Sequence, residues 1–326
     1  MPEPASSDPP PTPWIGPDGQ LMRRLELHLT YTCPERCVFC SEDHRMRDFR
    51  AFPVTWGRVA TVLRTHASRG VTHLHLTGGE PSIHPRFLDV LRLAKRLGLS
   101  TSIGTIGTML KRPDIAREAM PLLDQALFSL HGPDAQVHDA LTRRTGSFEQ
   151  VTAAIALARA HNPGMLVAVT TVLTRLNAAQ LPRTVALAES LGARLIVVSN
   201  TTPEGAADDA YADLAVPLET LAALIAPTVA AAREAVLRFF GVPYCILGAH
   251  GALSNDLHWD PRVTVEWNRQ PGKVVFDDVW SWDPGRRRVF TPQCAGCAMK
   301  GLCRGVFDRY ATLWPTDALQ ALPGSG

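Results

Sequence analysis

The chain lacks any strong excess of charge of one sign. Its 326 residues hold 33 Lys and Arg against 31 Asp and Glu, for a formal net charge of +2. So balanced a composition gives no indication of nucleic-acid binding. The chain also lacks an apolar run of the roughly 18 residues that a membrane-spanning helix needs. We therefore expect a protein that binds neither nucleic acid nor a membrane.

The N-terminal segment lacks the apolar core of a secretory signal. Residues 1–20 are instead rich in proline, which predicts a disordered tail and a cytoplasmic protein. The rest of the chain is long enough for one large domain and a smaller one, and its 45% hydrophobic content is sufficient for a core.

Cysteine is sparse but clustered. The seven cysteines are Cys33, Cys37 and Cys40, then Cys245, then Cys294, Cys297 and Cys303. An odd number, Cys-x2-Cys spacings and the absence of a secretory signal favour metal binding over disulfides. A division into three and four uses every cysteine.

Short apolar runs alternate with helical patterns over the first two thirds of the chain. Such runs are typical of a parallel sheet buried on both faces. We therefore predict an α/β fold, a partial (β/α)6 TIM-like barrel over residues 21–240, with its chemistry at the C-terminal ends of the strands. The expected strands are Leu25–Thr30, His73–Thr77, Ser100–Ile106, Ala126–Leu130, Leu166–Leu173 and Arg194–Ser199. Ser147 and Gln150 have the spacing of a capping box at the start of a helix.

Beyond the barrel the alternation weakens. A long helix is expected over residues 218–237, and residues 241–315 are predicted to form a small cysteine-rich domain with few regular elements that needs a metal to hold it. Residues 316–326 are expected to be a tail. Within the small domain, Arg286-Arg287-Arg288 is interpreted as a solvated loop, with docking of an acidic electron donor as the alternative.

The first cysteine group supplies three thiolates, one fewer than the four that normally hold a cubane iron–sulfur cluster. One iron would then stay open to another ligand. Taken alone, the triplet also fits a zinc site with His44 as the fourth ligand. Gly78-Gly79-Glu80-Pro81 closes the second expected strand, so the two motifs are predicted to lie on the same rim of the barrel.

The Cys-x3-Cys-x2-Cys spacing, followed by Gly-Gly-Glu-Pro, resembles the signature of the radical S-adenosylmethionine (SAM) enzymes. The resemblance implies a [4Fe-4S] cluster held by Cys33, Cys37 and Cys40, with SAM bound through its amino and carboxylate groups to the open iron. Gly78, Gly79, Glu80 and Pro81 would contact the methionine amino group. The chemistry implied is reductive cleavage of SAM to a 5′-deoxyadenosyl radical that abstracts a hydrogen atom, with flavodoxin or ferredoxin as the electron donor.

Further SAM contacts are carried over from the same resemblance. Thr105-Ile106-Gly107 stands where the family usually has Thr-Asn-Gly, so a ribose contact is assigned to Ser102 or Thr105. Ser129 is assigned to the SAM carboxylate or ribose, although a serine that simply ends a strand is the alternative. Arg143 is assigned to the SAM carboxylate, with an exposed salt bridge as the alternative.

The last three cysteines, Cys294-x2-Cys297-x5-Cys303, resemble the core of the SPASM extension of radical SAM enzymes. A further cysteine of that pattern is replaced by Phe307, so one auxiliary [4Fe-4S] cluster is predicted, as in the shorter twitch variant. Cys245 is assigned as its fourth ligand. Two alternatives stay open: a structural thiol at Cys245, and a zinc site with four cysteines.

Strand parity places His75 inside the barrel, where it could act on substrate or be a hydrogen-bonded core histidine. Asn200 and Glu204 follow the sixth strand and are weaker candidates for substrate contact. The resemblance favours maturation of a peptide or natural product. Because only a short tail precedes the barrel in this sequence, nucleoside, sugar or cofactor biosynthesis is an alternative. A zinc-stabilised binding protein without catalysis and a former enzyme that kept the fold are the others.

Overall fold

A nine-stranded sheet organises the computed structural model, which describes residues 13, 15 and 19–324. Its order is β7-β6-β5-β4-β3-β2-β1-β8-β9, and β10 and β11 form a separate pair. The strands are β1 (Arg24–Thr30), β2 (His73–Gly78), β3 (Ser100–Thr105), β4 (Gln125–Ser129), β5 (Leu166–Leu173), β6 (Leu195–Asn200), β7 (Val236–Phe240), β8 (Arg262–Gln270), β9 (Lys273–Ser281), β10 (Arg288–Val289) and β11 (Val306–Phe307).

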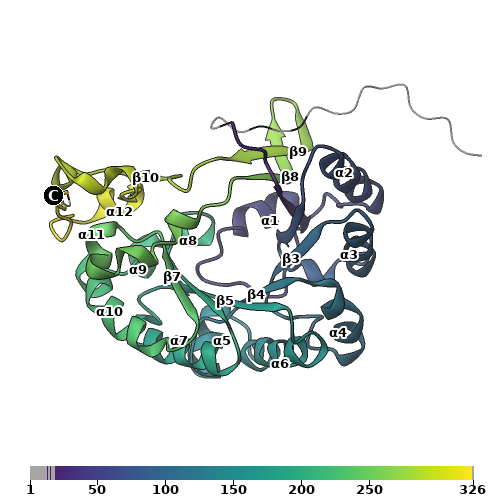
Figure 1. Ribbon diagram of the computed structural model, residues 1–326, viewed down its shortest axis with the longest axis horizontal. Helices are drawn as coiled ribbons and strands as arrows, with labels where there is room; N and C mark the ends of the chain where they lie inside the picture. The colour runs from purple at the N-terminus through teal and green to yellow at the C-terminus, as the bar shows by residue number, and fades with distance from the viewer. Residues whose placement is uncertain (1–12, 14, 16–18, 325–326) are drawn as a thin grey trace, which may run out of the picture.

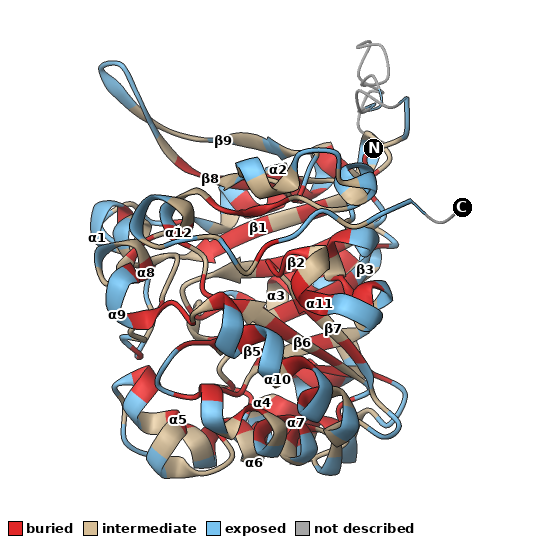
Figure 2. Ribbon diagram, turned by 90° about the vertical axis from the view of Figure 1, so that its left-hand side faces the viewer, coloured by how far each residue is buried: buried red, intermediate tan, exposed pale blue. Residues whose placement is uncertain are grey.

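Helices follow most of these strands. They are α1 (Asp43–Phe49), α2 (Trp56–Ser68), α3 (Phe87–Arg96), α4 (Pro113–Ala119), α5 (Ala135–Thr142), α6 (Ser147–His161), α7 (Leu181–Ser190), α8 (Ala206–Asp209), α9 (Tyr211–Leu214), α10 (Leu218–Ala231), α11 (Tyr244–Leu247) and α12 (Asp308–Leu313). Figure 1 shows α2, α3, α4, α6, α7 and α10 along the outer side of the curved sheet. In Figure 2, α1, α8 and α9 lie together at one end of the strands.

The two faces of β1 show why this sequence folds as a barrel. Leu25, Leu27 and Leu29 are fully buried toward the helices, whereas Glu26 and His28 alternate with them and point to the inner side. Strands β1 to β6 pair in parallel, each with the next along the chain. The predicted partial barrel is confirmed.

The helix expected over residues 218–237 is wrong at its C-terminal end. Helix α10 ends at Ala231, and Val236–Phe240 forms β7, which pairs in parallel with β6. The carboxylate of Glu189 accepts hydrogen bonds from the backbone N–H groups of residues 233, 234 and 235. These three bonds turn the chain between α10 and β7, and they connect positions too far apart in sequence for a local pattern to reveal.

The expectation of few regular elements in residues 241–315 is also wrong in part. Strands β8 and β9, of nine residues each, form a hairpin, and β8 joins the main sheet in parallel with β1. Pro271 and Gly272 make the turn, with Gly272 at a φ of 74°, and the exposed tip stands out in Figure 2. Pro-Gly between two β-branched runs is the signal that would have predicted the hairpin. The division of the chain into two domains at residue 240 stays a prediction.

The Arg286–Arg288 run is not a solvated loop. The side chain of Arg288 is 1% exposed and pairs with that of Asp256, which is 2% exposed. Arg287 donates to the carbonyl of Pro203 and pairs with Asp208 and Asp308. Only Arg286 is well exposed, at 67%. The run therefore links the C-terminal region to the rest of the molecule. The alternative interpretation, that the run docks an electron donor, has no structural support among the described residues.

Among the described residues, no helix combines the length and the apolar character needed to cross a membrane.

Candidate functional site

The three-cysteine loop joins β1 to α1 and is held by its backbone. Arg36 N–H donates to Thr142 O (3.1 Å) and Val38 N–H donates to Leu141 O (2.9 Å), which fixes the loop against the end of α5. The carbonyl of Cys40 accepts from Ala206 N–H at 2.9 Å, in the loop after β6. The first and sixth strands of the barrel thus both contribute to the surroundings of the cysteines.

The Gly-Gly-Glu segment lies against this loop. Gly79 N–H donates to Thr30 O (2.7 Å) and Glu80 N–H donates to Thr32 O (2.9 Å), so the end of β2 runs beside the residue that precedes Cys33. A Cβ atom at Gly79 would lie 2.3 Å from the carbonyl oxygen of Thr32. Glycine is therefore required here by close approach of two backbones, and the two predicted motifs meet on one rim.

The carboxylate of Glu80 is fully buried and joins the ends of β2 and β3. It accepts hydrogen bonds from the Thr105 hydroxyl (2.7 Å) and from the backbone N–H of Ile106 (2.8 Å), and it contacts the hydroxyl of Ser82. Burial raises the pKa of this carboxyl, although the hydrogen bonds act against the shift. Glu80 and Thr105 are thus brought together, and Glu80 positions the rim.

Ser102 lies apart from this group. Its hydroxyl is 2.8 Å from Nε2 of His73 and 2.8 Å from Nδ1 of His75, three residues before Thr105 on the same strand. Burial lowers the pKa of His75 to about 3, so the imidazole is neutral. His75 has the contacts of a hydrogen-bonded core histidine. The ribose role of Ser102 and the substrate role of His75 stay predictions.

The thiols of the first loop lie in a poorly solvated environment. Burial raises the pKa of Cys33 and of Cys40 to about 12, and that of Cys37 well above its ordinary value. Iron binds the thiolate, so the protons must leave when a cluster is bound. Three half-buried thiols within one eight-residue loop fit an iron–sulfur cluster by the chemistry of the donor set.

A buried carboxyl accompanies the cysteines and was missed by the sequence analysis. Glu35 is 3% exposed, its Oε2 lies 3.6 Å from Sγ of Cys37, and it accepts a hydrogen bond from the Ser147 hydroxyl. Ser147 in turn lies 3.0 Å from Nε2 of His138. The capping box predicted at Ser147 is therefore wrong: the N-cap of α6 is Gly146, and the serine side chain turns inward to the cysteine loop.

The remaining four cysteines line one cavity. Cys245 lies in α11, and the other three lie in the segment after β10, 49 or more positions further along the chain. Apolar side chains share this cavity, including Phe290, Met299 and Leu319. Cys245 is thus placed with Cys294, Cys297 and Cys303, as its assignment as the fourth ligand requires.

Backbone donors point at these sulfur atoms. Tyr244 N–H and Gly305 N–H lie 3.5 and 3.3 Å from Sγ of Cys303, and Leu322 N–H lies 3.4 Å from Sγ of Cys297. Hydrogen bonds of this kind to sulfur are typical of iron–sulfur sites. Among the described residues, no group of three or more His, Cys, Asp or Glu side chains is close enough to enclose a single metal ion.

Two further predicted residues make few contacts. Ser129 is partly exposed at the end of β4. Arg143 is exposed, adopts a left-handed conformation with φ of 52° after α5, and takes part in none of the ion pairs found among the described residues. Arg144, its neighbour, is the one whose charge acts on Glu35. The roles assigned to Ser129 and Arg143 stay predictions.

The candidates after β6 have structural contacts of their own. Asn200 is buried and donates to Gly241 O at 3.1 Å, and Glu204 pairs with Arg286 at 3.1 Å. Their roles toward substrate also stay predictions.

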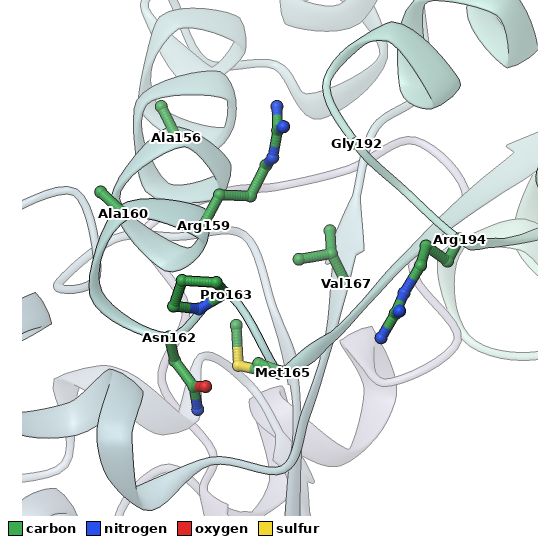
Figure 3. Close-up of a pocket in the computed structure, with 9 residues that line it drawn as sticks. All are labelled: Ala156, Arg159, Ala160, Asn162, Pro163, Met165, Val167, Gly192 and Arg194. Carbon is green, nitrogen blue, oxygen red and sulfur yellow. The ribbon is translucent and has the colours of Figure 1, made fainter.

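A hollow of about 570 Å³ lies at the opposite end of the sheet. Met165 and Arg194, which directly precede β5 and β6, line it together with Arg159 of α6 (Figure 3). Parallel strands put all their C-terminal ends on one edge, so this hollow is remote from the cysteine loop. It is not the site described above.

Comparison with known proteins agrees with this geometry. Residues 27–188 match the model of the radical SAM superfamily. The chain belongs to the radical SAM superfamily. Membership implies a [4Fe-4S] cluster and SAM as cofactors, and it gives no support to a zinc-stabilised protein without catalysis.

Curated relatives of this radical SAM protein include the PqqA peptide cyclase of Methylocella silvestris, 30% identical over 177 residues, which are 54% of this chain and 47% of that protein. The mycofactocin maturase MftC of Mycobacterium tuberculosis is 30% identical over 191 residues, covering 58% of this chain and 47% of that protein. The chain thus spans about half the length of the curated relatives it matches.

Solved structures share the fold at low identity. SuiB of Streptococcus suis bound to S-adenosylmethionine aligns with a TM-score of 0.60 at 15% identity, covering 92% of this chain and 76% of that one. The enzyme anSMEcpe with bound AdoMet and a Cp18Cys peptide aligns with a TM-score of 0.59 at 13% identity, covering 91% and 92%. These likenesses confirm the radical SAM fold expected from the sequence.

Proposed function

We propose that this radical SAM protein modifies a peptide by radical chemistry. The curated relatives are named as a peptide cyclase and as a maturase of mycofactocin, and they match more than half of this chain. The observation that carries the proposal is the junction of Thr32, Gly79 and Glu80, which sets the three-cysteine loop beside the end of β2.

Cys33, Cys37 and Cys40 would hold the [4Fe-4S] cluster and leave one iron to SAM. When bound, the cluster supplies the electron that cleaves SAM to methionine and a 5′-deoxyadenosyl radical. The exposed edge of Gly78 and Gly79 would orient the methionine amino group of SAM, while the buried Glu80 keeps that edge at a fixed distance from β3.

The protein's further role would be to keep water from the reacting atoms. The inner side of β4 to β6 presents Leu127, Val172 and Val197, which are partly exposed apolar side chains. Ser129 and Thr105 would contact the ribose or carboxylate of SAM from the ends of their strands, with Arg143 as a further candidate for the carboxylate.

Cys245, Cys294, Cys297 and Cys303 would hold one auxiliary [4Fe-4S] cluster. The support is their common cavity and the backbone N–H groups directed at Cys297 and Cys303. The two cluster sites together would account for all seven cysteines. Flavodoxin or ferredoxin would provide the electrons, and a reducing compartment such as the cytoplasm would keep the thiols free.

Anaerobic reconstitution followed by a SAM cleavage assay tests the proposal. With dithionite as reductant, the protein should form 5′-deoxyadenosine, and Cys33→Ala should abolish this product. Addition of candidate peptides should then yield a product whose formation is coupled to SAM consumption. A reconstituted protein that holds iron but cleaves no SAM would refute the assignment.

A further inference from the structure

A small group of charged side chains lies on the inner side of the barrel, outside the assignments made above. His28 of β1, Glu42 and Arg45 at the start of α1, and Glu266 of β8 come together there. Nε2 of His28 lies 3.5 Å from Oε2 of Glu266, and Nδ1 of His28 lies 3.5 Å from Oε2 of Glu42. The histidine thus stands between two carboxylates.

Two of these atoms are buried without a hydrogen-bond partner. They are Nδ1 of His28, whose side chain is 4% exposed, and Oε2 of Glu42. Burial lowers the pKa of His28, which favours the neutral imidazole with a single N–H. When Nε2 carries that proton toward Glu266, Nδ1 presents a lone pair to the carboxylate of Glu42. We call these two atoms the acceptor pair.

The charges of the group are unevenly matched. Arg45 approaches Oε1 of Glu42 at 3.1 Å and Oε2 of Glu266 at 3.3 Å, so one guanidinium serves two carboxylates. Two carboxyl groups thus share one guanidinium, and Oε2 of Glu42 is left without a hydrogen-bond donor. A buried acceptor without a donor is costly. A ligand that brings a positively charged N–H group would supply that donor.

The position of the group suits a substrate. Glu42 follows Cys40 by two residues, and His28 lies opposite Thr77, directly before Gly78 of β2. The acceptor pair is therefore close to both motifs of the rim. Glu204 and Arg286, which pair with each other, also act electrostatically on Glu42 and extend the polar wall.

We propose that the acceptor pair of His28 and Glu42 binds a cationic nitrogen of the substrate, an ammonium or guanidinium group such as that of a lysine or arginine side chain. The inference rests on the proposed function in taking the ligand to be a peptide. Glu42 and His28 accept hydrogen bonds from the cationic nitrogen, and Glu266 holds the histidine tautomer.

The test measures binding of N-acetyl-L-lysine methylamide to the full-length, cluster-loaded protein by anaerobic saturation-transfer NMR titration. The neutral analogue N-acetyl-L-norleucine methylamide has a similar chain without the charge. We expect the lysine probe to bind at least about tenfold more tightly than the norleucine probe. Glu42→Gln and Glu266→Gln should each reduce that preference by about tenfold, whereas Glu234→Gln, on an exposed turn, should leave it unchanged.

Glu42 is close to a cluster ligand, so its variant needs a check of iron content and of the unfolding midpoint. If Glu42→Gln loses iron, Glu266→Gln decides, because β8 carries no cysteine. Equal binding of the two probes, or full preference retained in Glu266→Gln, would overturn the proposal. Cleavage of SAM with no preference for the lysine probe would leave the proposed function intact and refute only the cation site. A preference that depends on Glu42 without any SAM cleavage would do the reverse.

Discussion

Replacing Asp256 with asparagine should destabilise the protein more than almost any other single charge change. The side chains of Asp256 and Arg288 are 2% and 1% exposed, and Nη2 of Arg288 donates to Oδ1 of Asp256 at 2.9 Å. The guanidinium also lies 4.9 and 5.3 Å from the ring centroids of Phe240 and Phe307. Asp256→Asn keeps the shape but leaves Arg288 charged, buried and without its counter-ion.

The expected cost follows from that burial. Removal of one partner of a buried ion pair typically costs about 3–5 kcal/mol, because the remaining charge cannot reach water. For a chain of this size, such a loss lowers the thermal midpoint by roughly 5 °C. Because Arg288 lies in β10, shortly before Cys294, the iron content of the auxiliary site should fall as well.

Thermal and urea unfolding of the anaerobic protein measure this effect. The double variant Asp256→Leu with Arg288→Met should recover much of the loss, since apolar side chains can replace a buried pair at little cost. Asp114→Asn is a matched control: Asp114 makes the same two-pronged contact with Arg112, but at the surface. A cost for Asp256→Asn below about 1 kcal/mol, the range of surface pairs, would refute the reasoning.

Three further outcomes are expected. Gly79→Ala should cost about 1–3 kcal/mol and lower SAM cleavage, because its Cβ would overlap Thr32 O; Gly57→Ala, which meets nothing within 4 Å, should not destabilise in the same urea titration. Burial lowers the pKa of His138 to about 4. The neutral imidazole therefore contributes to the free energy of unfolding above pH 6.5, and this contribution is lost as the pH falls toward 4. Urea unfolding should show wild type losing about 2 kcal/mol more between pH 7 and pH 5 than His138→Asn, and equal losses would contradict the assigned cause. Cys297→Ala should lower the iron content by one cluster and leave SAM cleavage uncoupled from product; an unchanged iron content would rule out its role as a ligand.

The elements with strong local patterns were predictable from the sequence. Leu25, Leu27 and Leu29 identify β1 by their alternation, and the spacing of Cys33, Cys37 and Cys40 identifies the loop that follows it. Both signals lie within a few residues of one another along the chain. For this reason the barrel and its rim motifs could be expected before the structure was known.

The predictions that were wrong failed because the deciding contacts join residues far apart in the sequence. The end of α10 depends on the Glu189 carboxylate, which lies more than forty residues earlier in the chain and collects three backbone N–H groups. The burial of Arg288 depends on Asp256, and a basic run gives no local sign of such a partner. In each case a distant side chain overrides the local preference.

The same division holds at the candidate site. By itself the sequence predicted a donor set for each of the two cysteine groups and indicated the family to which the chain belongs, because spacing within a short loop is a local property. Only the tertiary structure shows that Cys245 shares a cavity with the C-terminal cysteines, that Glu35 lies buried beside Cys37, and that β8 brings Glu266 to His28. The contact of Glu266 with His28 depends on the pairing of β8 with β1, which joins segments more than two hundred residues apart.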